Sequence, residues 1–334
     1  MRVLMVTTEW PRVAFGTAQF VARQAAFLQA AGIDVHVYPF LGERNPLNYA
    51  SAWLEVRRLI RRGGFDLVHA QFGQSALLAF PKRLPLVVTF RGDDLQGILG
   101  DEDGRLTLSG RLLQRFCRWV AHRADAVIVV SAHMRRYLRN GRRVHENGRP
   151  VHVVPSGIDF ELFRPLPQAA ARARLSLPQD ERIVLFVGNP NLARKRFSLA
   201  QAAVTRLQET LPTRLVVAWL VSHTEIPYYL AAADVLVFTS VQEGSPNAVK
   251  EALACDLPVV SVPVGDVAER LQGVAGCEVC PDDRPETVAA ALERVLARGG
   301  RVAGRAAVSH LDEHLITEQV IAIYRAAITG RAQA

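Results

Sequence analysis

The sequence predicts an α/β protein with two domains, each built on a parallel β-sheet. Short Val/Ile/Leu-rich runs alternate along the chain with amphipathic stretches, which is typical of strands buried on both faces of a parallel sheet. The alternation begins at residue 2 and begins again at residue 183, after a polar connection at 172–182. The length of 334 residues also fits two domains.

The first half of the chain reads as one sheet covered by helices. Helical patterns occupy 18–32 and about 48–62. Because strands joined through helices run parallel, the strands should form a single parallel sheet. The predicted strands lie at 2–8, 34–40, 66–70, 84–90, 125–131 and 151–157.

The second half repeats this pattern. Helices are expected from 197, near 226–233 and 266–272, and from 285, and the tail at 313–330 reads as one more amphipathic helix. The predicted strands lie at 183–188, 215–220, 234–240, 258–262 and 277–280.

Composition indicates an ordinary soluble chain, with 49% hydrophobic and 22% charged residues. No apolar run is long enough to span a membrane, and the first one reads as a strand rather than a signal segment. Four cysteines fit reduced thiols in the cytoplasm, and the single CxxC pair, Cys277 and Cys280, does not predict a zinc site.

The net charge of +8 is concentrated in Arg-rich helical stretches at 55–64, 111–123 and 133–143. Solvated helix faces and attraction to an anionic membrane surface or lipid-phosphate acceptor both explain this excess. Nucleic-acid binding is a third explanation, but no nucleic-acid motif accompanies the charge.

Ligands of open parallel sheets bind beyond the carboxyl ends of the strands, so the loops there should carry the chemistry. The first such loop, 8–17, contains neither GxGxxG nor a P-loop, which argues against a nicotinamide or flavin enzyme. Its Gly16 and Thr17 precede a helix. They either bring backbone amides close to a phosphate or sugar hydroxyl, or simply form the turn.

The strand at 84–90 ends in Arg91, Gly92, Asp93 and Asp94. Paired acids can orient hydroxyls or bind a metal, but they are equally common as caps. No further ligand cluster accompanies them, so no metal is predicted.

The strand at 183–188 leads through Gly188 and Asn189 to three consecutive cations, Arg194, Lys195 and Arg196. Between a strand and a helix, such cations can neutralise a diphosphate. A solvated basic turn is the alternative.

The segment "EGSPNAVKEA" (243–252) follows the strand at 234–240. Glu243 precedes a helix that begins at 245–247 and whose free amides attract an anion. Glu251 comes eight residues later, about 800° around the helix, on nearly the same face. Two acids and an anion site suit a sugar nucleotide. The alternative interpretation of this segment is a capped helix with an exposed Glu and no ligand.

Together these segments resemble glycosyltransferase family 4, retaining enzymes of the GT-B fold. The resemblance rests on the motif segments 66–73, 87–94, 153–165, 193–200 and 243–269. It implies two Rossmann-like βαβ domains whose parallel sheets face an interdomain cleft. Residues 1–160 would bind the acceptor and 161–312 the nucleotide-sugar donor, and a C-terminal helix within 313–334 would pack back on the first domain.

The resemblance also implies roles for individual residues. Glu251 would hold the ribose, Glu243 would contact the donor sugar, and Lys195 with Arg194 or Arg196 would neutralise the leaving diphosphate. Other donor contacts are expected from Gly188, Asn189, Gly244, Ser245, Pro246, Asn247 and Ala248. Glu243, Lys195 and Arg91 are the predicted catalytic residues, whereas Gly16, Thr17, Gly92, Asp93 and Asp94 would lie on the acceptor or sugar side.

Three positions depart from the family pattern. Arg91 stands where the family often has His, and Arg can only donate hydrogen bonds. Asn189 replaces a usual Arg, so only the later cations can serve the phosphates. The loop 221–230 follows its strand without the usual glycine-rich ending, which leaves the base of the donor open.

The predicted activity is transfer of a hexosyl group, with retention, from a nucleotide sugar to a glycan, lipid-linked or small-molecule acceptor. No metal or other cofactor is expected, and no nucleic acid. The expected location is cytoplasmic, with peripheral contact to an anionic membrane at its inner face. A nucleotide-sugar epimerase of the same fold and a non-catalytic nucleotide-sugar-binding protein are the alternatives.

Overall fold

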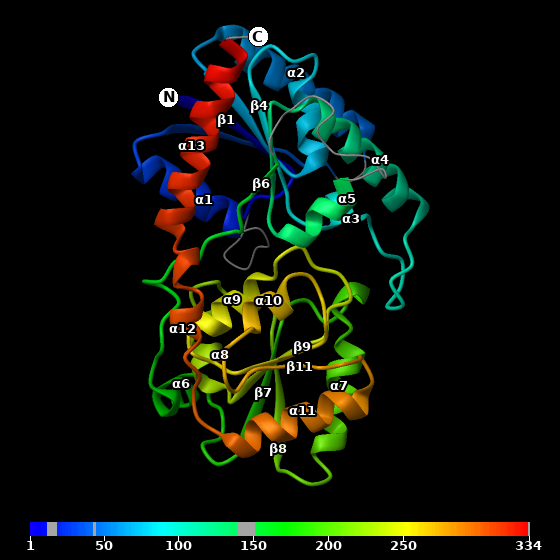
Figure 1. Cartoon of the computed structure of the whole chain (residues 1–334), viewed down its shortest axis with the longest axis vertical. Helices are drawn as coiled ribbons and strands as arrows, with labels where there is room; N and C mark the ends of the chain where they lie inside the picture. The colour runs from blue at the N-terminus through cyan, green and yellow to red at the C-terminus, as the bar shows by residue number, and fades with distance from the viewer. Residues whose placement is uncertain (12–18, 43–44, 139–150, 333–334) are drawn as a thin grey trace. The chain divides into compact units, whose positions relative to one another are not determined.

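The computed structural model describes residues 1–11, 19–42, 45–138 and 151–332. They cluster into two compact units (Figure 1). The first unit comprises Met1–Ile98, Leu106–Gly157 and the C-terminal segment from Glu313, and the second comprises Leu99–Arg105 and Ile158–Asp312. The chain therefore returns to its first unit at the C-terminus.

The first unit is built on a six-stranded parallel sheet in the order β2-β1-β3-β4-β5-β6. Most of its strand residues are buried aliphatic side chains, as predicted for strands covered on both faces. The strands are β1 (Arg2–Thr7), β2 (Asp34–Pro39), β3 (Leu67–Gln71), β4 (Leu86–Phe90), β5 (Ala126–Val129) and β6 (Val151–Val153).

Helices cover both faces of this sheet. Because strand side chains alternate, Leu4 and Val6 of β1 join the core under α2, η1 and α4, whereas Val3 and Met5 join the core under α1 and α13. The helices are α1 (Gln19–Ala30), α2 (Pro46–Arg62), η1 (Gly73–Ala79), α3 (Asp93–Gln96), α4 (Leu108–Arg123), η2 (Ala132–Met134), α5 (Arg135–Leu138) and α13 (Glu313–Ala332).

The C-terminal helix α13 is an integral part of the first unit and packs beside α1 (Figure 1). It contributes buried side chains at a helical spacing, among them Ile316, Val320, Ile323 and Tyr324. The Tyr324 hydroxyl lies 2.5 Å from Nδ1 of His69 on β3. The tail thus supplies both apolar surface and a polar contact to the sheet.

His69 is completely buried, and Nε2 of its ring lies 2.8 Å from the Thr89 hydroxyl. Burial, assisted by the nearby charge of Arg91, lowers its pKa to about 3. The unfolded chain binds a proton on His69 below pH 6.5, its ordinary pKa, whereas the folded chain does not until about pH 3. The contribution of neutral His69 to the free energy of unfolding is therefore fully present above pH 6.5 and decreases as the pH falls toward 3.

We expect this histidine to make the first unit acid-sensitive. Lowering the pH from 7 to 5 should remove about 2 kcal/mol of unfolding free energy through His69. Urea unfolding followed by tryptophan fluorescence, since Trp10, Trp53 and Trp119 belong to this unit, would measure it. His69→Gln should show a shallower acid dependence, and an unchanged slope would contradict this assignment.

The second unit is built on a five-stranded parallel sheet in the order β11-β10-β9-β7-β8. Strands β7 and β9 lie in its middle, so the loops that follow them are neighbours. The strands are β7 (Arg182–Val187), β8 (Thr213–Ala218), β9 (Val235–Phe238), β10 (Val259–Ser261) and β11 (Glu278–Val279).

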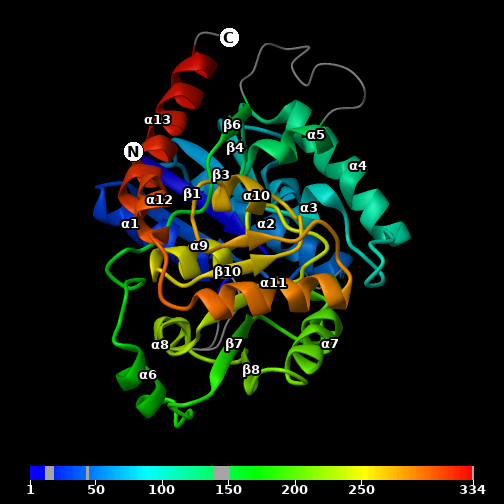
Figure 2. The ribbon, with the colours of Figure 1, turned by 60° about the horizontal axis from the view of Figure 1, so that its bottom comes forward.

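Helices α7 and α11 pack together and lie side by side along this sheet (Figure 2). Most of the other segments form one large apolar core with the strands, and α6 packs on α8 in a small separate apolar cluster. The helices are α6 (Gln168–Arg174), η3 (Ala193–Lys195), α7 (Phe197–Leu207), α8 (Ile226–Ala232), α9 (Asn247–Ala254), α10 (Val267–Leu271), α11 (Pro285–Arg298), α12 (Gly304–Ala307) and η4 (Ser309–Leu311).

The start of the connection predicted at 172–182 is helical instead, because α6 extends to Arg174. Alanine-rich sequence favours this helix. Arg172 also anchors it, since its guanidinium donates to Asp234 at 2.8 Å and to the Ala232 carbonyl.

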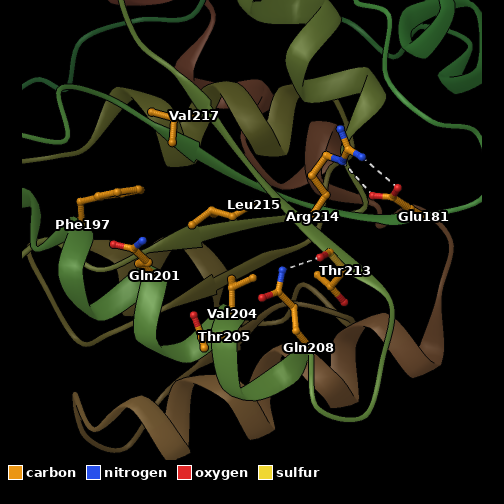
Figure 3. A pocket seen from close by; sticks show the side chains of 10 residues that line it. All are labelled: Glu181, Phe197, Gln201, Val204, Thr205, Gln208, Thr213, Arg214, Leu215 and Val217. Atoms are coloured by element: carbon orange, nitrogen blue, oxygen red, sulfur yellow. Dashed lines mark hydrogen bonds and ion pairs between the residues drawn. The ribbon is translucent and has the colours of Figure 1, made fainter.

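A pocket of about 510 Å³ lies at the edge of the second unit, between α7 and the edge strand β8 (Figure 3). Thr213, Arg214, Leu215 and Val217 line it from β8, and Phe197 and Val204 line it from α7. The acids and cations singled out in the sequence do not line this pocket, so it is distinct from the site described next.

Candidate functional site

The two loops that follow β7 and β9 are held together by backbone contacts. The Val241 amide donates to the Arg194 carbonyl at 2.9 Å. The Thr239 hydroxyl donates to the carbonyls of Lys195 and Arg196 at 2.9 and 3.0 Å. The basic segment and the loop that carries Glu243 therefore form one structure, as expected for loops at the same edge of a parallel sheet.

A carboxylate and two cations meet in these loops. Oxygen Oε1 of Glu243 accepts from Lys195 Nζ at 2.7 Å and from Arg194 Nη1 at 2.9 Å. The Glu243 and Lys195 side chains are mostly buried. The Lys195 ammonium also lies 5.3 Å from the centre of the Phe238 ring. We call Glu243, Lys195 and Arg194 the charge cluster.

The charge cluster keeps Glu243 ionised. Burial raises the pKa of this carboxyl, but the charges of Lys195 and Arg194 outweigh burial and hold the pKa below its usual range. Stability from this ionisation is present above the ordinary pKa of 4.5 and is lost as the pH falls through the lower folded value. At neutral pH the cluster thus contains one anion and two cations.

Arg196 does not join this cluster. Its backbone is left-handed, with φ of 45°. Its buried guanidinium donates to the Thr239 carbonyl at 2.9 Å and pairs with Asp283. Of the three consecutive cations, only Arg194 and Lys195 reach Glu243.

Helix α9 begins just beyond Glu243. Its N-cap is Pro246, whose side chain makes no capping hydrogen bond to the first turn. The preceding loop is fixed from the β10 side, because the Ser245 hydroxyl donates to buried Asp266 at 2.8 Å and Arg270 pairs with the same carboxylate. The first amides of α9 keep the partial positive charge of a helix end.

Glu251 lies on α9, mostly buried, with Oε1 3.4 Å from Nε2 of His223. His223 belongs to the loop after β8, and its ring packs edge-on against Phe163. His223 is not among the site residues predicted from the sequence. A histidine in a loop directly after a parallel strand was the signal that could have identified it.

Gly188 and Asn189 shape the loop after β7. Gly188 has φ of 136°, and a side chain there would approach Cε of Lys195 to 3.5 Å. The Asn189 side chain accepts from the Asn191 amide at 2.9 Å, so it stabilises its own turn. Gly244 is buried before α9, and Ala248 is half-buried in its first turn.

In the first unit, Arg91 is held by a polar network. Its guanidinium donates to Gln71 Oε1 at 2.7 Å, to Ser156 Oγ at 2.7 Å and to Gln24 Oε1 at 3.1 Å. It also lies over the Phe20 ring, 4.7 Å from the centre. Burial lowers the pKa of Arg91 to about 10, so it remains a cation at neutral pH.

Asp94 is a cap. Its buried carboxylate accepts from the amides of Gly73, Gly92 and Leu95 at 2.9–3.0 Å and from that of Arg91 at 3.1 Å. Asp93 is half-buried at the start of α3. Gly92 is buried in the same turn, whereas Gly16 and Thr17 lie outside the described residues.

Within residues 1–11, 19–42, 45–138 and 151–332, no group of three or more His, Cys, Asp or Glu side chains is placed to hold a metal ion. In the same part of the chain, no helix combines the length and apolarity needed to cross a membrane.

Solved structures with the same architecture are glycosyltransferases of the GT-B fold. Sucrose-phosphate synthase from Thermosynechococcus elongatus superimposes with a TM-score of 0.79 at 21% identity, covering 98% of this chain and 99% of that one. HepE from Anabaena, solved with UDP-glucose, gives a TM-score of 0.64 at 17% identity over both whole chains. The two parallel-sheet units define the GT-B class.

Two family models match the sequence. The model described as Glycosyltransferase Family 4 matches residues 2–162, and the one described as Glycosyl transferases group 1 matches residues 216–298. The chain belongs to glycosyltransferase family 4.

Relatives by sequence include D-inositol 3-phosphate glycosyltransferases. The protein from Segniliparus rotundus is 29% identical, over 87% of this chain and 68% of its own length. That from Mycobacterium tuberculosis is 30% identical, over 53% of this chain and 44% of its own length. The match thus spans less than half of the mycobacterial protein.

Proposed function

We propose that this glycosyltransferase uses a nucleotide-sugar donor, bound by the second unit at the charge cluster. The observation that carries the proposal is the pair of cations, Lys195 and Arg194, converging on Glu243 beside the uncapped end of α9. Cations next to a helix end form a site for phosphates. Solved relatives in complex with UDP and UDP-glucose support this donor class.

The residues around the cluster then take distinct roles. The donor diphosphate would lie against Lys195, Arg194 and the first amides of α9. Glu243 would turn from its two cations to the hydroxyls of the sugar, and Glu251 would accept from the ribose hydroxyls. His223, which contacts Glu251, would border the nucleoside.

The chemistry follows from this placement. The bond between the anomeric carbon and the diphosphate oxygen breaks, and a bond from the acceptor hydroxyl oxygen forms on the same face of the sugar. The acceptor proton passes to the departing phosphate, so configuration is retained and no enzyme nucleophile is needed. Lys195 and Arg194 stabilise the charge that develops on the diphosphate, in the role that a metal ion has in other transferases.

The first unit would bind the acceptor, with Arg91 as a fixed cation where the family often has a neutral histidine. Its guanidinium, held by Gln24, Gln71 and Ser156, can only donate, which favours an acceptor with anionic or strongly accepting groups. A glycan, a lipid-linked acceptor or a small molecule can supply these, and the transferred group is a hexose. The net charge of +8 favours acceptors at an anionic membrane, on its cytoplasmic face.

A panel of nucleotide sugars tests the donor proposal. We expect one or two of them to raise the thermal unfolding temperature and to be hydrolysed or consumed when acceptors are added, without a divalent metal and in the presence of a chelator. The anomeric configuration of the product, measured by NMR, should match that of the donor. If no nucleotide or nucleotide sugar binds, the donor proposal is wrong.

Lys195→Ala should weaken donor binding by about 10- to 100-fold, since a charge-assisted hydrogen bond to a phosphate contributes roughly 1.5–3 kcal/mol. The loss should be larger at low salt, because screening there is weakest. Isothermal titration at two salt concentrations would measure it. Arg206→Ala, an exposed α7 residue paired with Glu286, is the matched control. If Lys195→Ala binds the donor as tightly as the unsubstituted protein does, Lys195 does not belong to the phosphate site.

A further inference from the structure

The outward face of α4 has an unusual composition for an exposed helix. Leu108 is 75% exposed, Leu112 59% and Trp119 40%. At 100° per residue these positions fall within an arc of about 40°. Three large apolar side chains thus form one stripe along the helix, which we call the α4 stripe.

Cations flank the α4 stripe on both sides. Arg111 and Arg115 lie on one flank and Arg123 on the other, and all three are exposed. The Arg123 guanidinium lies 5.3 Å from the centre of the Trp119 ring. Between Leu108 and Arg123 the sequence contains no Asp or Glu. The outward face is therefore apolar along its centre and positive along its edges.

The opposite face of α4 fixes the helix to the first unit. Cys117 and Val120 are buried in the core. Gly110 packs so closely on Ile98 that a Cβ added to Gly110 would lie 2.4 Å from the amide nitrogen of Ile98. Trp119 rests on Phe116, at 5.8 Å between ring centres. The stripe is held outward by this packing, and its exposure is not a consequence of a loose helix.

The neighbouring helix α5 extends the positive surface. Arg118 of α4 donates to the Tyr137 carbonyl at 2.8 Å, which places the two helices side by side, as Figures 1 and 2 also show. Arg135 and Arg136 of α5 are exposed. Apolar side chains among arginines on a fixed helix are the composition of helices that lie in a membrane interface.

We propose that the α4 stripe docks this protein on the surface of an anionic phospholipid bilayer. Leu108, Leu112 and Trp119 enter the boundary between headgroups and acyl chains, and the flanking arginines contact lipid phosphates. A second copy of the chain on this face would bring arginines against arginines. A nucleic acid would engage the arginines but leave the leucines unused. The bilayer alone matches both parts of the surface.

Vesicle binding tests the proposal without any sugar nucleotide, so its outcome is independent of the donor site. Vesicles of neutral phosphatidylcholine are compared with vesicles that contain about 30% phosphatidylglycerol, at ~0.1 M salt. We expect binding at least about tenfold tighter to the anionic vesicles, reduced at ~0.5 M salt. Tryptophan emission should shift to the blue on binding, and Trp119→Phe should lose that shift.

Two double variants separate the contributions of the surface. Leu108→Ser with Leu112→Ser, and Arg111→Gln with Arg115→Gln, should each weaken binding about tenfold or more while the thermal unfolding temperature stays unchanged, because all four side chains are exposed. Leu315→Ser, an exposed leucine on α13, is the matched control and should bind as the unsubstituted protein does.

Three results would overturn the proposal. The first is equal binding of the anionic vesicles by the leucine double variant and the unsubstituted protein. The second is no vesicle binding at low salt. The third is a concentration-dependent dimer, or an RNA complex, that the same substitutions abolish while vesicle binding persists, which would assign the α4 stripe to that partner instead.

Discussion

Glu243→Ala should lower turnover by about 10²- to 10⁴-fold, the range typical of a positioned charged group at a reaction centre. Both cations of the charge cluster donate to Glu243. Removing its carboxylate would delete the proposed sugar contact and leave Lys195 and Arg194 without their shared anion. The fold should lose no more than about 3–5 kcal/mol, because Lys195 is mostly buried whereas the Arg194 side chain is partly solvated. Turnover with the preferred donor and thermal unfolding measure both effects.

Glu243→Gln separates a role in catalysis from a role in binding. The amide keeps the size of the side chain but removes the charge that neutralises Lys195 and Arg194. We expect the affinity for the nucleoside diphosphate product to stay equal or increase, while turnover falls. Glu286→Ala, on exposed α11 surface, is the control. Turnover within about twofold of the unsubstituted enzyme would exclude Glu243 from the reaction centre.

Deleting residues 313–334 should prevent the first unit from folding. Helix α13 buries Ile316, Val320, Ile323 and Tyr324 against the sheet and α1. Truncating one such side chain costs about 2–5 kcal/mol, and a domain is stable by only about 5–15 kcal/mol in total. The deletion also removes Glu313, which accepts from Arg23 at 2.9 Å. Loss of near-UV circular dichroism and of solubility would report the effect.

A milder substitution tests the same interface. Tyr324→Phe keeps the ring but removes the hydroxyl bonded to buried His69, and should cost about 1–3 kcal/mol. Leu315→Ser, on the exposed face of α13, should be nearly neutral. A truncated protein that is as stable and active as the full chain would contradict the structural role of this helix.

Much of the fold was predictable because its signals are local. Buried parallel strands require apolar runs, and those at 2–8, 84–90 and 183–188 became β1, β4 and β7 within one or two residues at each end. The error at α6 has a clear origin. Arginines made 172–182 look like a polar connection, whereas Arg172 is buried because Asp234 lies across from it.

The site was predictable to the level of its loops. Glu243 and the basic segment follow strands that proved to be neighbours, so their meeting is a consequence of topology. The direction of each side chain was not predictable. Arg196 sits beside Lys195 in sequence, yet its left-handed backbone turns it toward Asp283. The Asp94 carboxylate was expected to face a ligand. It is instead buried and accepts hydrogen bonds from four backbone amides.

The sequence by itself determined the two parallel sheets, the family and the loops that hold the candidate donor site. These follow from apolar periodicity and from motifs whose residues lie within one short segment. Only the tertiary structure decided which two cations neutralise Glu243, that His223 reaches Glu251, and that Tyr324 of α13 reaches His69. Each of these joins side chains distant in sequence, and such contacts depend on how packed elements orient them rather than on any local pattern.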